Sequence, residues 1–148
     1  YGGNDNAIAR AIFNTKTAGA GYTYSAGSAT LKTIEVEDDL TGATYRVFFF
    51  RPIETSLSFN VTVDRHLYAG TNLETDIKNA IKEYCQQSGI GASISREAAV
   101  AHIANVIPSI RIVSLTVGYT GSDPQDSISL NANRIPTTSD TNITVTES

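Results

Sequence analysis

Apolar and polar residues alternate strictly between Ser56 and Asp64, where Leu57, Phe59, Val61 and Val63 are separated by polar neighbours. This period of two predicts a β-strand with one buried face and one wet face. After it the apolar residues recur at helical spacing, which predicts a helix with a single buried stripe. The residues of that stripe are Leu73, Ile77, Ala80, Ile81 and Tyr84.

The ends of this helix carry their own signals. Thr71-Asn72-Leu73-Glu74 has the sequence of a capping box, in which Thr71 would accept from a first-turn amide. Glu74 would reach back to the amide of Thr71. Gly89 and Gly91 are expected to end the helix.

A shorter helix and another strand complete this core unit. Ser95 is the expected N-cap of the helix, and Pro108 ends it. Its apolar stripe consists of Ala99, Val100, Ile103 and Val106. The strand that follows has alternating apolar positions at Val113, Leu115, Val117 and Tyr119. The order strand, helix, helix, strand organises the rest of the chain.

The residues before this unit predict a helix and a hairpin. The helix runs to about Lys16, with Asn4 or Asp5 as its cap. Its apolar face is narrow and consists of Ile8, Ala11 and Ile12, with Phe13 at the edge. A strand from about Leu31 to Glu37 is followed by a turn at residues 38–42, where Gly42 can take a positive φ.

The return strand of the hairpin is apolar on both faces. Tyr45, Val47 and Phe49 share one face, and Phe48 and Phe50 lie on the other with an arginine. Such a strand is expected to be covered on both sides. Either a second helix of the same domain covers the Phe48 face, or that face is a subunit interface, which aromatic residues favour.

Residues 17–30 form a loop rich in Gly, Ala, Ser and Thr, in which Tyr22 and Tyr24 are the large side chains. These tyrosines are expected to pack on this domain or on a neighbouring chain, and we count them as interface candidates. The N-terminal helix and this loop have too little apolar surface to pack strongly on their own domain. We therefore expect both segments to reach a neighbouring subunit. The expected domain organisation is residues 1–30, with the helix and the loop, and residues 31–148, with the α+β domain.

The C-terminal part predicts two more short strands. Residues 120–126 form a polar turn, and Ile128 and Leu130 indicate a strand. Residues 131–140 are expected to be a loop interrupted by Pro136, before a last strand with Ile143 and Val145. The fold class is therefore α+β: a mainly antiparallel sheet with helices packed on it.

Composition narrows the possible functions. The chain has 148 residues, the size of about one domain. Its net charge of -4 and scattered basic residues argue against a nucleic-acid partner. No apolar run approaches the length needed to span a bilayer, so we expect no membrane partner. The chain begins at Tyr1 and contains no Met, so we expect it to be a piece of a longer protein.

The chemically active residue types are few and scattered. Cys85 is the single cysteine, so an internal disulfide is impossible. We expect Cys85 to be a small buried hydrophobic residue. His66 and His102 belong to no cluster with metal-ligand spacing. The acidic residues 35–39 are expected to form a solvated hairpin turn rather than a calcium site. We therefore expect no catalytic residue, cofactor, metal or small-molecule substrate.

The ordered set of segments resembles baseplate J-like proteins over nearly the whole chain. The segments that carry the resemblance are Gly2-Gly3-Asn4-Asp5, Ile8-Ala9, Ala11-Ile12, Lys16-Thr17-Ala18-Gly19, Val47-Phe48-Phe49-Phe50-Arg51-Pro52, Leu57 to Val63, Asp76-Ile77-Lys78-Asn79-Ala80-Ile81, Ile107-Pro108-Ser109-Ile110, Asn133-Arg134-Ile135-Pro136 and Thr144-Val145-Thr146. Each segment alone is a generic strand or cap, and their order carries the resemblance.

The resemblance implies the C-terminal portion of a wedge protein in the baseplate of a contractile phage tail or a related injection machine. Such proteins are structural, assemble side by side into a ring around the tail hub and help transmit the trigger for sheath contraction. The implied partners are other baseplate and tail subunits, including copies of the chain, in a virion assembled in the bacterial cytoplasm. The low charge and high Ser, Thr and Tyr content leave an adhesin or fibre-type binding module as the alternative.

Overall fold

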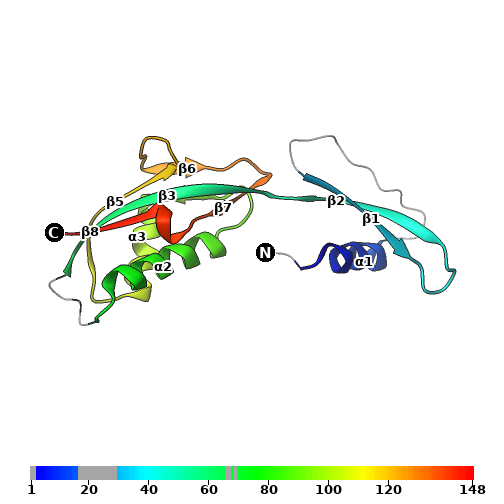
Figure 1. Cartoon of the computed structure of the whole chain (residues 1–148), viewed down its shortest axis with the longest axis horizontal. Coiled ribbons are helices and arrows are strands. Elements are labelled where there is room, and N and C mark those ends of the chain that lie inside the picture. Colours follow the sequence, from blue (N-terminus) through cyan, green and yellow to red (C-terminus); the bar gives the residue numbers. More distant parts are fainter. Residues whose placement is uncertain (1–2, 17–29, 66–67, 69) are drawn as a thin grey trace. The chain divides into compact units, whose positions relative to one another are not determined.

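The chain divides into two compact units in the computed structural model, which describes residues 3–16, 30–65, 68 and 70–148 (Figure 1). Unit 1 is Tyr1–Pro52 and unit 2 is Ile53–Ser148. The chain has the predicted α+β fold, with mostly antiparallel sheets. The predicted boundary at residue 30 lies inside unit 1, which extends to Pro52, because the hairpin packs on the N-terminal helix.

Unit 1 is a helix packed on a two-stranded hairpin. Helix α1 (Asp5–Thr15) lies against β1 (Thr30–Glu37) and β2 (Thr44–Arg51), which pair antiparallel. The fully buried core is small and consists of Ala9, Val36 and Val47, with Ile12, Phe13, Ile34 and Phe49 packed against it. The ring of Phe13 lies 5.3 Å from that of Tyr45.

Two expectations about α1, its lack of packing on its own domain and its apolar face, are therefore wrong, whereas its contact with a neighbouring subunit stays a prediction. The helix packs on its own unit, because Ala9 on its buried face contacts the hairpin core. Ala11, which the sequence placed on the apolar face, is exposed. The small Ala9 side chain lets the helix approach the strands closely, and a count of large apolar residues misses this position. Tyr22 and Tyr24 of the adjoining loop lie outside the described residues.

The start of α1 joins the helix to the open end of the hairpin. Asn4 is the N-cap, because its side-chain oxygen accepts from the amide of Asn6 at 2.8 Å. Asp5 instead accepts from Arg51 of β2, with 2.6 Å between its Oδ1 and the Nη2 of Arg51. The same Nη2 also donates to the carbonyl oxygen of Gly3. One arginine thus holds the helix N-terminus against β2.

The turn of the hairpin has the predicted glycine chemistry. Gly42 has a φ of +68°, a backbone conformation that residues other than glycine rarely adopt. The Gly42 amide donates to the Asp38 carbonyl, and the Asp38 amide donates to the Ala43 carbonyl. Asp38 therefore faces two residues of the other strand, the geometry of a glycine-type β-bulge. This bulge sets the register, in which Val36 faces Tyr45.

Strand β3 (Ile53–Asp64) is the centre of unit 2. Strand β5 (Arg111–Tyr119) pairs antiparallel with one edge of β3. The other edge carries two parallel partners, β7 (Arg134–Thr137) and β8 (Ile143–Glu147). The two partners divide the edge between them: β7 pairs with residues 53–56 and β8 with residues 59–63.

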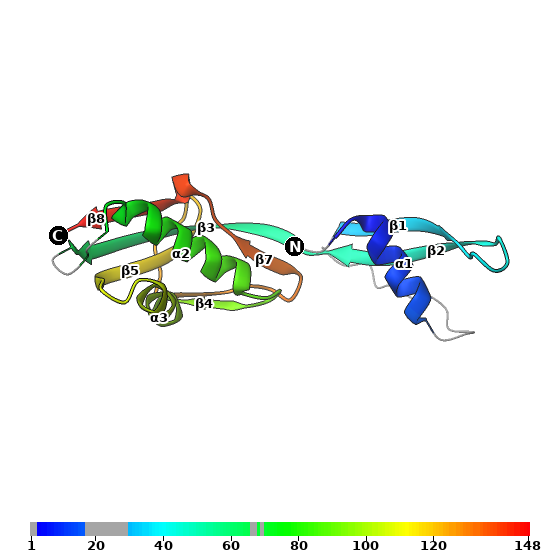
Figure 2. The same cartoon turned by 90° about the horizontal axis from the view of Figure 1, so that it is seen from below.

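Helices α2 (Leu73–Gln87) and α3 (Arg96–Val106) cover one face of this sheet (Figures 1 and 2). Ile77 and Ile81 of α2 are fully buried in one cluster with Phe59, Val61 and Leu115 of the sheet, as the sequence predicts. The opposite face of β3 is polar, so the predicted alternation describes a sheet that is buried on one side.

The capping box predicted for α2 does not form. The helix begins at Leu73 with Asn72 as its N-cap, and the cap has no side-chain hydrogen bond. With Asn72 as N-cap, Glu74 is the second helical residue and not the third, which a capping box requires, and its carboxylate accepts from Lys78 one turn later, at 2.6 Å. At the other end the helix stops at Gln87, where Ser88 donates its hydroxyl to the Tyr84 carbonyl at 2.8 Å.

Helix α3 has the predicted N-cap but a shifted apolar stripe. The hydroxyl of Ser95 accepts from the amide of Ala98 at 3.2 Å. Ala99 and Ile103 are buried as expected, but Val106 is 47% exposed. Ile107 is buried in its place, because the chain leaves helical geometry there on its way to Pro108.

The sequence pattern did not predict strands β4 (Ser93–Ser95) and β7 or the bulge in β5. Strand β4 pairs with β6 (Ser127–Ser129), and β7 lies in the region expected to be a loop. Pro136 of β7 is tolerated because a proline fits an edge strand. Val113 is 56% exposed despite its place in the alternation, because the register of β5 shifts opposite Thr62 and Val63.

The packing of α2 yields a prediction about stability. Replacing Ile81 with Ala should lower the free energy of unfolding by about 2–5 kcal/mol, because it leaves a cavity in the buried cluster. Urea unfolding followed by circular dichroism measures the change. Val113→Ala, on an exposed side chain, is the control and should stay within about 0.5 kcal/mol of the parent. Equal midpoints for the parent and the Ile81 variant would contradict the docking of α2.

The two unit 2 helix caps differ in a way that mutation can test. Ser95→Ala removes a side-chain cap bond and should lower the free energy of unfolding by about 0.5–2 kcal/mol. Asn72→Ala should have a much smaller effect, because Asn72 makes no side-chain cap bond. The two variants are compared by urea unfolding. A larger loss of unfolding free energy for Asn72→Ala than for Ser95→Ala would show that the Asn72 side chain does cap α2.

Candidate functional site

The interface residues that the sequence singled out lie on the hairpin of unit 1. Phe48 and Phe50 of β2 point to the face opposite α1, where Phe48 is half-buried and Phe50 is 38% exposed. Their cross-strand neighbours on this face are Thr33 and Leu31, respectively. Leu31 was missed as a candidate, although the bulge at Gly42 fixes the register that places it beside Phe50.

Among the described residues, the face of the hairpin that a helix covers is the one with Val36 and Val47. The covering helix is α1, the single helix among the described residues of unit 1. Within residues 3–16 and 30–52, no second helix covers the face with Phe48 and Phe50. The interface explanation for Phe48 and Phe50 stays a prediction.

The tip of the hairpin presents an apolar side chain on an ordered turn. Leu40 is 95% exposed, while its amide donates to the Asp38 carboxylate at 2.9 Å. Thr41 donates its hydroxyl to the other oxygen of this carboxylate, also at 2.9 Å. The amide of Leu40 and the hydroxyl of Thr41 lower the pKa of Asp38, in that order of importance. Both carboxylate oxygens thus serve the turn, in keeping with the expectation of a solvated hairpin tip.

A second charged feature near the tip ties it to the helix. Arg10 of α1 donates to Asp39 at 2.9 Å, and both side chains are largely exposed. Pairs of this kind contribute little stability, about 0–1 kcal/mol. Within the part of the chain that the structure describes, no group of three or more His, Cys, Asp or Glu side chains could hold a metal ion.

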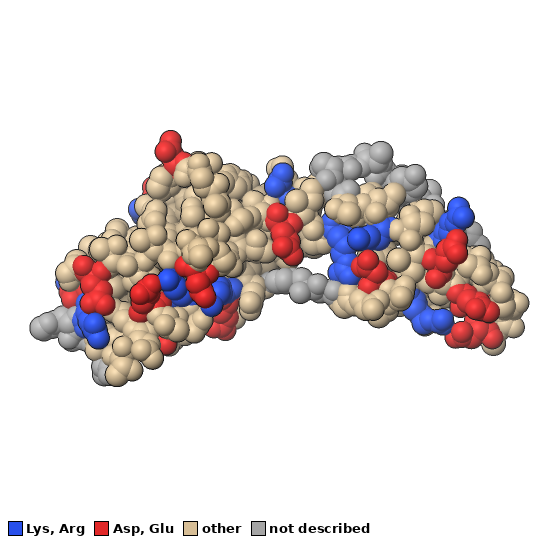
Figure 3. Space-filling view, in the orientation of Figure 1, with Lys and Arg blue, Asp and Glu red and all other residues tan. Residues whose placement is uncertain are grey.

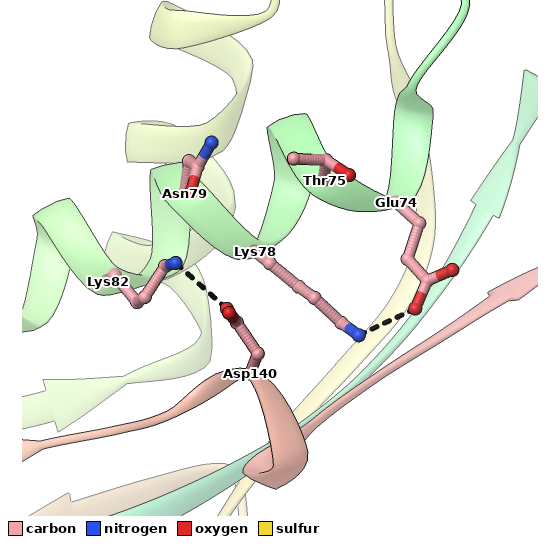
Figure 4. Close-up of a pocket in the computed structure, with 6 residues that line it drawn as sticks. All are labelled: Glu74, Thr75, Lys78, Asn79, Lys82 and Asp140. Atoms are coloured by element: carbon pink, nitrogen blue, oxygen red, sulfur yellow. Dashed lines mark hydrogen bonds and ion pairs between the residues drawn. The ribbon is translucent and has the colours of Figure 1, made fainter.

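Unit 2 has an open groove beside α2, with a cavity volume of about 250 Å³ (Figure 4). Its lining residues are Glu74, Thr75, Lys78, Asn79, Lys82 and Asp140. Lys78 points toward Glu74, and Lys82 donates to Asp140 at 2.8 Å. Lys82 is the main cause of the lowered pKa of Asp140. Each cation already has an anionic partner, so the groove shows no surplus charge for a ligand.

The Lys82–Asp140 pair has a structural role instead. Asp140 begins the short 3-10 helix η2 (Asp140–Asn142), which leads directly into β8. The ion pair therefore links α2 to the segment that positions the second parallel partner of β3. The amide side chain of Asn142 also donates to Ser56 of β3 at 2.9 Å.

Neither histidine belongs to a catalytic arrangement within the described residues. His66 lies outside them. His102 of α3 is half-buried, and its ring lies 5.8 Å from that of Tyr84. Its Nε2 is buried without a hydrogen-bond partner, 3.9 Å from the nearest oxygen of Glu83. This separation is too long for a hydrogen bond.

Charges on the face drawn in Figure 3 are interleaved, and neither sign forms a broad patch. On this face the charges of the described residues form no continuous basic track of the kind that a phosphate backbone binds. Among the described residues, no helix is long and apolar enough to cross a membrane.

Cys85 is buried in the core cluster of unit 2, at 2% exposure. Burial raises the pKa of its thiol to about 12, because the thiolate would lose its hydration. The reactive form of cysteine is the thiolate. Cys85 therefore behaves as a small hydrophobe, as the sequence predicts, and is unsuited to nucleophilic chemistry.

The buried thiol gives a labelling prediction. At pH 8 the native protein should resist an aromatic disulfide reagent, because the thiol is protonated and inaccessible. The same protein in concentrated urea should react with one thiol per chain, and this is the internal control. Rapid stoichiometric labelling without denaturant would contradict the burial of Cys85.

Comparison with known proteins adds no identification to this geometry. No protein-family model matches the chain, and no curated protein matches it. The residues and contacts described above are therefore the basis on which a function is proposed.

Proposed function

We propose that the chain is a structural component of a large assembly, of the kind found in the baseplate of a contractile phage tail or a related injection machine. The observation that carries this proposal is the small core of unit 1 beneath exposed apolar side chains. Its described residues contain three fully buried core side chains, while Leu40, Tyr45 and Phe50 are more than a third exposed. A unit with so small a core gains stability when neighbours cover its apolar surface.

The order of elements supports the same proposal. Helix, hairpin, long strand, two helices and further strands follow one another in the order of the segments that resemble baseplate J-like proteins. A wedge protein of a baseplate assembles side by side with copies of itself and with other tail subunits. Under this proposal the chain acts in the virion, with protein subunits as its partners.

The proposal includes the absence of catalysis. Catalytic sites combine a nucleophile or base with an orienting partner within hydrogen-bond reach. Cys85 and His102 lack this combination, because the Cys85 thiol is buried and His102 lacks a partner for its buried nitrogen. We propose that the chain has no enzymatic activity and needs no cofactor.

A binding module of an adhesin or fibre is the second candidate, and the polar face of the unit 2 sheet favours it. In the middle of this sheet the side chains opposite the helices are uncharged on three adjacent strands, and the charged pair of Asp64 and Arg111 lies at one end of them. The uncharged side chains are Asn60 and Thr62 of β3, Ser114 and Thr116 of β5, and Thr144 and Thr146 of β8. Hydroxyl and amide groups can bind polar ligands such as sugars.

The baseplate proposal predicts where the chain is found. Contractile tail particles from a lysate of the source organism are purified by density gradient, and their proteins are identified by mass spectrometry. The chain should sediment with the sheath and tube proteins. Detection only on cell surfaces, together with carbohydrate binding that is lost in Thr62→Val, would contradict the baseplate proposal and favour the binding module.

The contact surface of unit 1 predicts a matched pair of variants. Phe50→Asp should reduce the amount of the chain in purified particles by about tenfold or more, as expected for the loss of an aromatic interface residue. Tyr119→Asp changes a residue of unit 2 with similar exposure, at 36%, and is the control. Both proteins must show the circular dichroism of the parent. Equal incorporation of the two variants would remove the Phe50 face from the interface.

A further inference from the structure

The outer edge of β1 leaves backbone hydrogen-bonding groups without partners among the described residues. Pairs in an antiparallel ladder alternate between hydrogen-bonded and non-hydrogen-bonded. The bonded bulge at Asp38 therefore makes Glu37 and Thr44 a non-bonded pair and Val36 and Tyr45 a bonded one. It follows that Leu31, Thr33, Glu35 and Glu37 direct their amides and carbonyls away from β2.

An open edge of this length is unusual for a finished sheet. The strand has eight residues and contains no proline, glycine or bulge. Natural proteins normally shorten, twist, charge or cover such an edge, because its free groups pair readily with another strand. Strand β1 has charged side chains at Lys32, Glu35 and Glu37, and the pairing below places each of them opposite an uncharged residue. Two-stranded sheets are also marginally stable by themselves. The core of unit 1 adds to this need, because it has three fully buried side chains.

We infer that β1 pairs antiparallel with β1 of a second copy of the chain, about a two-fold axis at Ile34. The resulting four-stranded sheet joins two hairpins edge to edge. This inference rests on the proposed structural function and names the partner and the contact. A two-fold contact uses the same surface on both copies, so a single strand supplies both halves of the interface.

The residues of β1 suit this self-pairing. In a register centred on Ile34, Thr33 lies opposite Glu35 of the second copy and Leu31 lies opposite its Glu37. Lys32 lies opposite Val36 of the second copy, so no charge directly faces a like charge, which would be destabilising. Ile34 meets its own copy on the side that α1 covers. The pairing therefore extends the small apolar cluster of unit 1 across the axis.

A proline at Thr33 separates this contact from the fold of the monomer. The amide of Thr33 points outward, so Thr33→Pro removes no bond to β2, and an edge strand tolerates proline with its amide side toward solvent. The matched control is Thr33→Ala, which keeps the amide. Sedimentation equilibrium of the full chain up to millimolar concentration measures the association.

The parent and Thr33→Ala should form dimers, and Thr33→Pro should weaken the association by about tenfold or more. Their circular dichroism should be alike. A monomeric parent over the whole range would overturn the inference, as would a dimer that Thr33→Pro leaves unchanged. Neither result bears on whether the chain is found in tail particles, so this inference can fail while the proposed function stands.

Disulfide cross-linking tests the register and does not depend on how proline is tolerated. Residues 33 and 35 of opposite copies would lie about 5.5 Å apart between Cα atoms, within disulfide range. A mixture of Thr33→Cys and Glu35→Cys proteins should give cross-linked dimers on mild oxidation. Thr33→Cys mixed with Val113→Cys is the control, since residue 113 lies in unit 2. Equal cross-linking in both mixtures would overturn the pairing.

Discussion

The burial of one face of β3 is the constraint on which unit 2 depends. Leu57, Phe59, Val61 and Val63 are at most 1% exposed, and their side chains lie in one cluster with those of α2, α3 and β5. Because side chains alternate along a strand, a shift of one residue would turn all four into water. The paired strands on both edges of β3 hold it against such a shift. Its role as the central strand follows from its sequence pattern and its neighbours together.

Unit 1 is built in the same way as unit 2 but has a much smaller buried core. Its hairpin also buries one face under a helix, but the fully buried side chains are Ala9, Val36 and Val47. Polar contacts supplement this core at both ends: Arg51 with Asp5 at the open end, and Arg10 with Asp39 at the tip. These contacts are partly exposed and contribute modestly to stability. Unit 1 therefore has less internal support than unit 2 does.

The sequence predicted the elements with strong periodicity and missed those without it. The alternation of β3 and the helical spacing of α2 were sufficient to place the core, because each pattern extends over two or more turns or pleats. Strands β4 and β7 have three and four residues, too short for a period, and β7 contains Pro136. The predicted N-cap of α2 was wrong because the helix begins one residue later than expected, which puts Glu74 at the second helical position, where it pairs with Lys78. Partner choice of this kind depends on side-chain geometry that a local motif does not contain.

The candidate site was only partly predictable for a related reason. The aromatic run at Phe48 and Phe50 is visible in the sequence, whereas Leu31 and the open edge of β1 depend on cross-strand register. That register follows from a single bulge, in which Gly42 permits Asp38 to face two residues. In unit 2 both edges of the central strand are occupied, and its bulge lies within a paired strand. In unit 1 the bulge lies at the turn, so the full length of β1 keeps its outward groups in one regular row. A regular row of this kind can accept another strand.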